Sequence, residues 1–196
     1  VYEEVGHVDG RPGTRIERGY DVRGNLAWAE HDMEGDGVPD VRERWSNDPD
    51  GRHETKEVDV GIDGLSGGED MTVKYTYYLD RTLRSEERDQ GADGSVDSRY
   101  AFVYLDGGAT VIEDYVWLSE EDRGEIYYRN ERGFDDAGRM TSLSHDMHAN
   151  GVVQWRRHYR YDALGRLIEE TQDTGDDGVT EFRTTYSYDC WEPPAG

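Results

Sequence analysis

Acidic side chains recur around Asp-Gly and Asn-Gly steps in the pattern D-x-x-x-[DN]-G-x-x-[DEQ]. Oxygen-rich loops of this kind can supply the roughly six to eight ligands that Ca²⁺ prefers. The candidate calcium ligands are Asp32, Glu34, Asp36 and Asp40; Asp89, Asp93 and Asp97; and Asp173, Asp176, Asp177 and Glu181. The spacing differs from that of the EF-hand loop and lacks its distant bidentate Glu. The alternative is that these acids cap turns and solubilise a sheet edge.

The histidines offer little evidence of catalysis. They are His7, His31, His53, His145, His148 and His158. His145 and His148 flank Asp146 as in a metal pair, but an exposed turn explains this spacing as well. No GxSxG, HExxH or P-loop pattern occurs. Because an active site needs a unique constellation, a repeating motif argues against an enzyme. We therefore expect no catalytic residue and no cofactor other than Ca²⁺.

The acidic motif belongs to a longer internal repeat. Four copies have an apolar anchor six residues before the first Asp, and these pairs are Leu26 and Asp32, Leu83 and Asp89, Met140 and Asp146, and Leu167 and Asp173. Two weaker copies place His53 and Thr110 at the anchor, and the second has an insertion with its turn near Arg123-Gly124. The anchors then follow one another at 27, 30, 27, 30 and 27 residues. Since Asp9-Gly10 fits the same frame, the chain holds about seven units with the first incomplete.

Each unit is predicted to be a β-hairpin. Asp-Gly and Asn-Gly steps favour tight turns because these residues tolerate a positive φ. The segment after each step alternates at period two, as in Trp155, Arg157, Tyr159 and Tyr161. A helix competes only at SEERDQ, where the register of the neighbouring copies favours a strand. The sequence therefore predicts an all-β array of about fourteen antiparallel strands over residues 1–196, in one extended, twisted or spiralled sheet.

A second motif, Y-D-x-x-G-[RN]-L, connects the units. Its residues are Tyr20, Asp21, Gly24 and Leu26; Phe134, Asp135, Gly138 and Met140; Tyr161, Asp162, Gly165 and Leu167; and the closing Tyr188 and Asp189. The motif is degenerate at Tyr78-Leu79-Asp80 and Tyr104-Leu105-Asp106. We expect the Tyr to pack on its neighbour while the Asp caps a tight turn that the Gly completes.

This signature resembles the YD-repeat (Rhs) family across nearly the whole chain. The resemblance implies a secreted or cell-surface bacterial protein, and in that family the repeats wind a β-sheet into a hollow shell or spiral. This chain departs from the pattern by its longer acidic hairpin tips. It is also too short, at 196 residues, to enclose a toxin, so an encapsulating role is not carried over.

The composition restricts the partners. The net charge is −23, which repels phosphate backbones and anionic lipid, so we expect no nucleic-acid partner. No run of about 18 apolar residues exists, so we expect no membrane insertion. The mean hydropathy of −1.00 would suggest disorder, but the regular placement of 14 Tyr and 5 Trp indicates an ordered sheet. Cations or a basic protein are the expected counterparts.

The expected function is a non-enzymatic structural or assembly scaffold, able to self-associate into a fibre. The chain starts at Val1 without Met, which indicates a processed product or a fragment. Residues 190–196 form a Pro-containing tail that could block an open sheet edge, and Cys190 could lock an assembly. Two alternatives remain. One is a surface module that binds a glycan or protein through aromatic rows such as Tyr159 and Tyr186, and the other is a fragment of a larger Rhs-type shell.

Overall fold

The computed structural model describes residues 2–8, 11–65, 68–118 and 124–188. Within these ranges all regular structure is β, apart from a single 3-10 turn at Asp106–Gly108. No helix in the described part of the chain is long and apolar enough to cross a bilayer. The predictions for Val1, Asp9-Gly10, Arg123, Asp189 and the tail at 190–196 with Cys190 lie outside the described residues.

Fourteen antiparallel strands are described, which confirms the predicted all-β hairpin array. They are β1 (Tyr2–Val8), β2 (Arg11–Tyr20), β3 (Leu26–Asp32), β4 (Val41–Asn47), β5 (His53–Val60), β6 (Met71–Tyr77), β7 (Leu83–Gln90), β8 (Ser98–Leu105), β9 (Thr110–Trp117), β10 (Ile126–Phe134), β11 (Met140–Met147), β12 (Trp155–Tyr161), β13 (Leu167–Thr174) and β14 (Phe182–Thr185). The strand order in the sheet is the order in the sequence.

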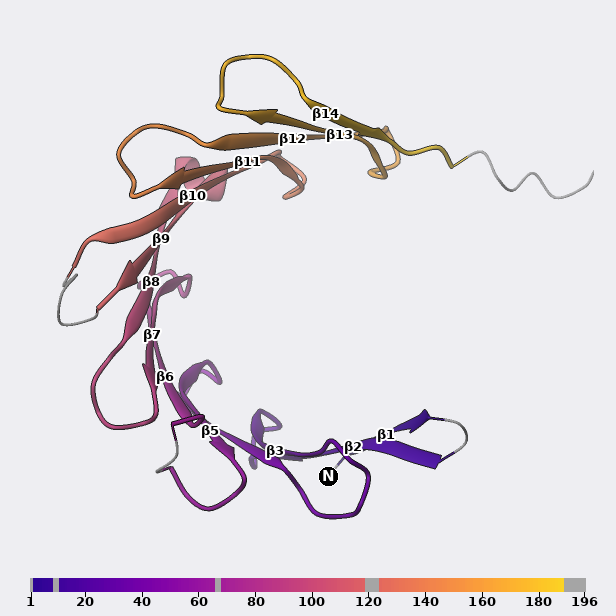
Figure 1. Cartoon of the computed structure of the whole chain (residues 1–196), viewed down its shortest axis with the longest axis vertical. Helices are drawn as coiled ribbons and strands as arrows, with labels where there is room; N and C mark the ends of the chain where they lie inside the picture. Colours follow the sequence, from indigo (N-terminus) through magenta and orange to yellow (C-terminus); the bar gives the residue numbers. More distant parts are fainter. Residues whose placement is uncertain (1, 9–10, 66–67, 119–123, 189–196) are drawn as a thin grey trace, which may run out of the picture. The chain divides into compact units, whose positions relative to one another are not determined.

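The chain divides into two compact units. One contains Val1–Arg99 with Leu118–Glu121, and the other contains Tyr100–Trp117 with Asp122–Gly196. Strands β1–β7 therefore lie in the first unit and β9–β14 in the second. Within each unit, every strand lies beside the strand that precedes it in the sequence (Figure 1).

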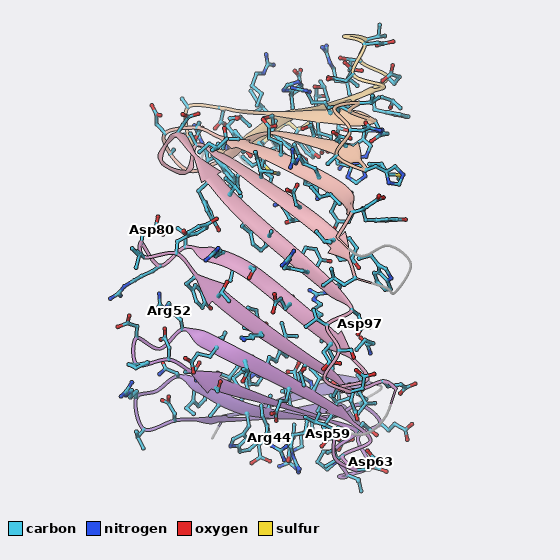
Figure 2. All side chains as sticks on the ribbon, turned by 90° about the vertical axis from the view of Figure 1, so that its left-hand side faces the viewer. Arg44, Arg52, Asp59, Asp63, Asp80 and Asp97 are labelled. Carbon is cyan, nitrogen blue, oxygen red and sulfur yellow. The ribbon has the colours of Figure 1, made fainter. Side chains whose placement is uncertain are left out.

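Two kinds of turn alternate along the array. The longer loops between the two strands of a hairpin, here called tips, carry the acidic motif, and the shorter junction turns connect one hairpin to the next. In the first unit, Asp59, Asp63 and Asp97 mark the tip end of the strands, whereas Arg52 and Asp80 mark the junction end (Figure 2).

The register shifts by one residue at the junction end of the sheet. The shifts fall at Gly19/Tyr20, Ser46/Asn47, Thr76/Tyr77, Gly133/Phe134 and Arg160/Tyr161. Such bulges re-aim the side chain beside them. The residue at the Tyr position of the motif is thus placed by a bulge in these five junctions.

The buried core is thin and contains more acids than apolar side chains. The buried apolar residues of the described chain are Ala29, Val73 and Val116. The buried acids are Asp32, Asp48, Asp59, Asp70, Asp89, Glu113 and Asp146. Buried carboxylates are tolerated where they are paired or hydrogen-bonded. Glu113 lies within β9 and accepts from Asn130 and Arg132, whereas the other buried acids lie near the ends of the strands, so the fold depends on how those ends satisfy them.

Candidate functional site

The first Asp of each acidic motif organises its tip by accepting backbone N–H groups. At Asp32 the amides of Gly35 and Gly37 donate to Oδ1 at 2.6 Å and Oδ2 at 2.8 Å. At Asp89 the amides of Asp93 and Gly94 donate at 3.1 Å and 2.8 Å. Asp146 and Asp173 repeat the arrangement with donors four and five residues later. In each tip the backbone amides take the place of the water molecules that would otherwise solvate the carboxylate. Charge-assisted bonds of this kind compensate for the cost of burying it.

The remaining motif positions serve the same loop. The Asp or Asn before the Gly accepts from the amide two residues later, as Asp36 does from Val38 at 2.8 Å. The last position, which we call the closing residue, accepts from the amide that follows the first Asp. Asp40 accepts from Met33 at 2.6 Å, and Asp97, Gln154 and Glu181 take the same role. Because Gln154 does so without a charge, the position requires an oxygen acceptor and not an anion.

The distances between carboxylate oxygens reduce the number of candidate calcium sites. Among the described residues, two groups of acids bring their oxygens within 4.8 Å of one another. One is Asp173, Asp177 and Glu181, which was predicted; the other is Asp59, Asp63 and Asp70, in which Asp70 takes the closing position after a loop with three extra residues. The other candidate acids, Asp32, Glu34, Asp36, Asp40, Asp89, Asp93, Asp97 and Asp176, are in neither group. Turn capping accounts for the bonds of Asp32 and Asp89.

Among the described residues, His145 and His148 belong to no group of three or more potential metal ligands. His145 stacks on Trp155 with ring centroids 5.3 Å apart, and it bonds Asn130 through Nδ1 at 2.9 Å. His148 lies on an exposed turn, as the alternative prediction has it.

The junction Asp caps its turn as the sequence predicts. The amides of Leu164 and Arg166 both donate to Asp162 Oδ1 at 2.9 Å, and Arg166 Nε donates to Oδ2 at 2.7 Å. Asp135 makes the same bonds with Ala137 and Arg139. The side-chain bond from Arg139, with its backbone amide, lowers the pKa of Asp135, and the Arg166 amide followed by its side chain lowers the pKa of Asp162. Both carboxyl groups are therefore charged throughout the neutral range.

At three junctions the Arg also contacts the Tyr of the next unit. The guanidinium carbon lies 4.8 Å from the ring centroid for Arg52 and Tyr77, 5.0 Å for Arg139 and Tyr161, and 4.7 Å for Arg166 and Tyr188. Each of these Tyr hydroxyls donates to the carbonyl of the preceding anchor, His53, Met140 or Leu167, at 2.8–2.9 Å. We call this combination the junction latch. It joins an Asp-fixed cation, a ring and a backbone carbonyl from consecutive units.

The Arg and the Tyr occur together along the chain. All three units that carry Arg before the anchor are followed by a unit with Tyr. Where Asn25 replaces the Arg, Asn47 replaces the next Tyr and donates to the Leu26 carbonyl at 2.9 Å. Where Ala109 replaces it, the next position is Phe134. At the junction before Tyr104, the position of the Arg is held by Thr82.

Two junctions have a frame that sequence reasoning missed. Asp48 caps a full junction turn, accepting from the amides of Asp50 and Arg52 at 2.9 Å, although Asn47 precedes it instead of Tyr. The D-x-x-G-R spacing of Asp48 would have revealed it. At the degenerate junction the signature Tyr is Tyr77, not Tyr78, because Tyr77 carries the hydroxyl bond and the bulge. At this junction Asp80 Oδ1 accepts from Thr82, both from its backbone amide at 3.0 Å and from its hydroxyl at 2.7 Å.

Comparisons with known proteins concern the fold. No family model matches the chain, and no curated protein matches it in sequence. The crystal structure of TcdB2-TccC3 is similar with a TM-score of 0.53 and 15% identity, over 88% of this chain and 9% of that chain; the structure without the hypervariable C-terminal region gives the same values. A porin-like protein from Bacteroides uniformis ATCC 8492 is similar with a TM-score of 0.51 and 10% identity, over 92% of this chain and 91% of that one. The chain thus spans only 9% of the length of TcdB2-TccC3. The fold of this chain is a β-repeat fold related to that of TcdB2-TccC3.

Proposed function

We propose that the chain is a non-enzymatic structural scaffold, secreted or displayed on a bacterial surface, whose units assemble by adding further repeats at the edge of the sheet. The observation that supports this proposal is the junction latch. Because it links consecutive units through the same three groups at three junctions, we expect stability to accumulate from neighbour to neighbour, as in other repeat proteins. Because the same contacts recur along the sheet, a further copy of the repeat could add to its edge through those contacts.

The last described strand offers a place for such an addition. All four residues of β14 are exposed, and Phe182 is 64% exposed. An exposed strand edge invites pairing with another chain unless it is blocked. The proposed partner is the sheet edge of a second copy.

Sedimentation and electron microscopy of the purified chain test this proposal, with and without Ca²⁺ and reductant. We expect oligomers or fibres that Phe182→Lys disrupts, since a charge on an edge strand opposes pairing. Val179→Lys is the matched control, because Val179 is similarly exposed at 58% but lies in the tip. A chain that stays monomeric at high concentration under every condition would overturn the assembly proposal.

The second candidate function is a stretch of wall within a longer shell protein. The likeness to TcdB2-TccC3, of which this chain matches 9%, supports it. An immunoblot of the source organism with an antibody against this chain distinguishes the two functions. A single band several times longer than 196 residues favours the shell, and a band of the length of this chain favours the separate scaffold.

A further inference from the structure

The tip between β9 and β10 lacks the polar residues that the tips after β3, β5, β7, β11 and β13 share. In the β9–β10 hairpin, Val116 occupies the position of the first Asp, six residues after the anchor Thr110. Tyr127 occupies the closing position. The backbone fixes this frame, because the His148 amide donates to the Tyr127 carbonyl at 2.8 Å just as the Gly175 amide donates to the Gln154 carbonyl at 2.7 Å. Apolar and aromatic residues thus replace both organising acids at the same tip.

The neighbouring tip carries a second departure on the same side. Its position two residues after the first Asp is glycine in three other tips, with φ of +83° at Gly61, +89° at Gly91 and +91° at Gly175. His148 holds this position with φ of +68°. The tip backbone thus adopts a positive φ at this position, and His148 does so with a side chain, at a conformational cost that glycine avoids.

The departures converge on one cavity of about 530 Å³, lined by Tyr115, Trp117, Glu125, Ile126, Tyr127 and His148. This volume is within the usual range for small-molecule sites. All six residues belong to the second compact unit. Trp117 is 44% exposed and Tyr127 is 51% exposed, so both rings are accessible from solvent. Among the tips of the described residues, the replacement of both organising positions by Val116 and Tyr127 belongs to this hairpin.

The lining rings meet at steep angles, and Tyr115 also stacks against Tyr128 with ring centroids 5.0 Å apart. The planes of Tyr115 and Tyr127 meet at 81°, those of Tyr127 and His148 at 85°, and those of Tyr115 and Trp117 at 56°. Their centroids are 6.0–6.3 Å apart in each pair. Aromatic faces carry negative partial charge, so accessible rings set at steep angles along the wall of a cavity attract a cation. A sugar would instead favour one flat, exposed ring as a platform.

We propose that this cavity binds a quaternary ammonium group, with choline as the representative ligand. Such a cation has no N–H donors, so it needs aromatic faces and not a full set of hydrogen-bond acceptors. Glu125 supplies a carboxylate at the wall, and the net charge of −23 draws cations toward the chain. The proposal stands independently of whether the chain assembles.

Calorimetric titration of the full chain with choline chloride tests the proposal, at constant ionic strength held by NaCl. We expect saturable binding that the neutral analogue of choline, with carbon in place of nitrogen, does not reproduce. Trp117→Phe should retain binding, whereas Trp117→Ala should weaken it by roughly tenfold, as expected for the loss of one cation–π wall. Tyr186→Ala is the matched control, because Tyr186 is 40% exposed and lies outside the cavity.

His148→Gly separates binding from folding. The glycine restores the repeat and relieves the strained φ, so the melting temperature should stay the same or rise while choline affinity falls. Three results would overturn the proposal: no saturation by choline, equal binding of the neutral analogue, or binding of methyl glucoside in place of choline. Unchanged affinity in both Trp117→Ala and His148→Gly would likewise exclude this cavity as the site.

Discussion

Replacing Tyr161 with Phe isolates one component of the junction latch. The substitution removes only the hydroxyl that donates to the Met140 carbonyl at 2.9 Å, and it leaves the ring beneath Arg139. A net contribution of about 1 kcal/mol is expected for such a bond. The Phe side chain has no group that could donate to the Met140 carbonyl in place of the lost hydroxyl. We expect the local free energy of opening to fall by about that amount.

The matched control is Tyr159→Phe, two residues earlier on the same face of β12. The Tyr159 hydroxyl has no such partner among the described residues. Repeat arrays do not always unfold in one step, so native-state hydrogen exchange of the β11–β13 amides is the appropriate measurement. The loss should be confined to these strands, because each unit contacts its neighbours.

A double-mutant cycle then measures the second component. Arg139→Gln and Tyr161→Leu are made singly and together, and the coupling energy should be about 0.5–1 kcal/mol for an exposed cation–π pair. The cycle subtracts the separate cost of losing the bond between Arg139 and Asp135. A coupling near zero, with equal effects of the Tyr161→Phe and Tyr159→Phe changes, would refute the latch.

The remaining predictions concern calcium, acid and backbone strain. If the tip with Asp173, Asp177 and Glu181 holds Ca²⁺, millimolar CaCl₂ should raise the melting temperature more than NaCl of equal ionic strength. Asp177→Asn should abolish this difference, whereas Asp36→Asn should leave it unchanged. Equal shifts in both salts would mean that the acids only cap turns. Asp162 has a lowered pKa, so its stabilising contribution is present above the usual value of 3.8 and is lost as pH falls through the lowered value. A nuclear magnetic resonance titration of this carboxyl at or above 3.8 would contradict that prediction. Arg81 has φ of +75°, so Arg81→Gly should stabilise the chain by up to about 1 kcal/mol in urea denaturation, and a destabilised variant would show that the strain is compensated.

The strands and most turns could be predicted because both depend on local patterns. Alternation at period two marks the second arms, and the Asp-Gly and Asn-Gly steps mark the tips. Burial of Asp32 could not be predicted from its type, since it depends on three amides that only the folded loop brings to one carboxylate. The partner of Arg139 was missed for a similar reason. Its Tyr lies 22 residues away, and a bulge that the sequence does not show sets the alignment.

The aromatic cavity was missed because its unit was interpreted as a degenerate copy of the repeat. Thr110 was interpreted as a weak anchor, and the frame after it was attributed to an insertion. Counting six residues from Thr110 to Val116 would have exposed the missing Asp. A repeat position at which the usual residue type is replaced can indicate a local function, because the loop there folds without the residues that the other tips share. His148 carried the same signal through its glycine equivalents at Gly91 and Gly175.

Strand order that follows the sequence has a consequence for biosynthesis. In the described pairs each strand bonds the strand made just before it, so a hairpin leaving the ribosome finds its partner already present. Few long loops need to close, which favours fast folding for an all-β chain. A nascent chain that ends after β7 already contains every partner that β2–β6 require. We therefore expect the strands to pair in the order of their synthesis, each new hairpin adding to the edge of the sheet already formed.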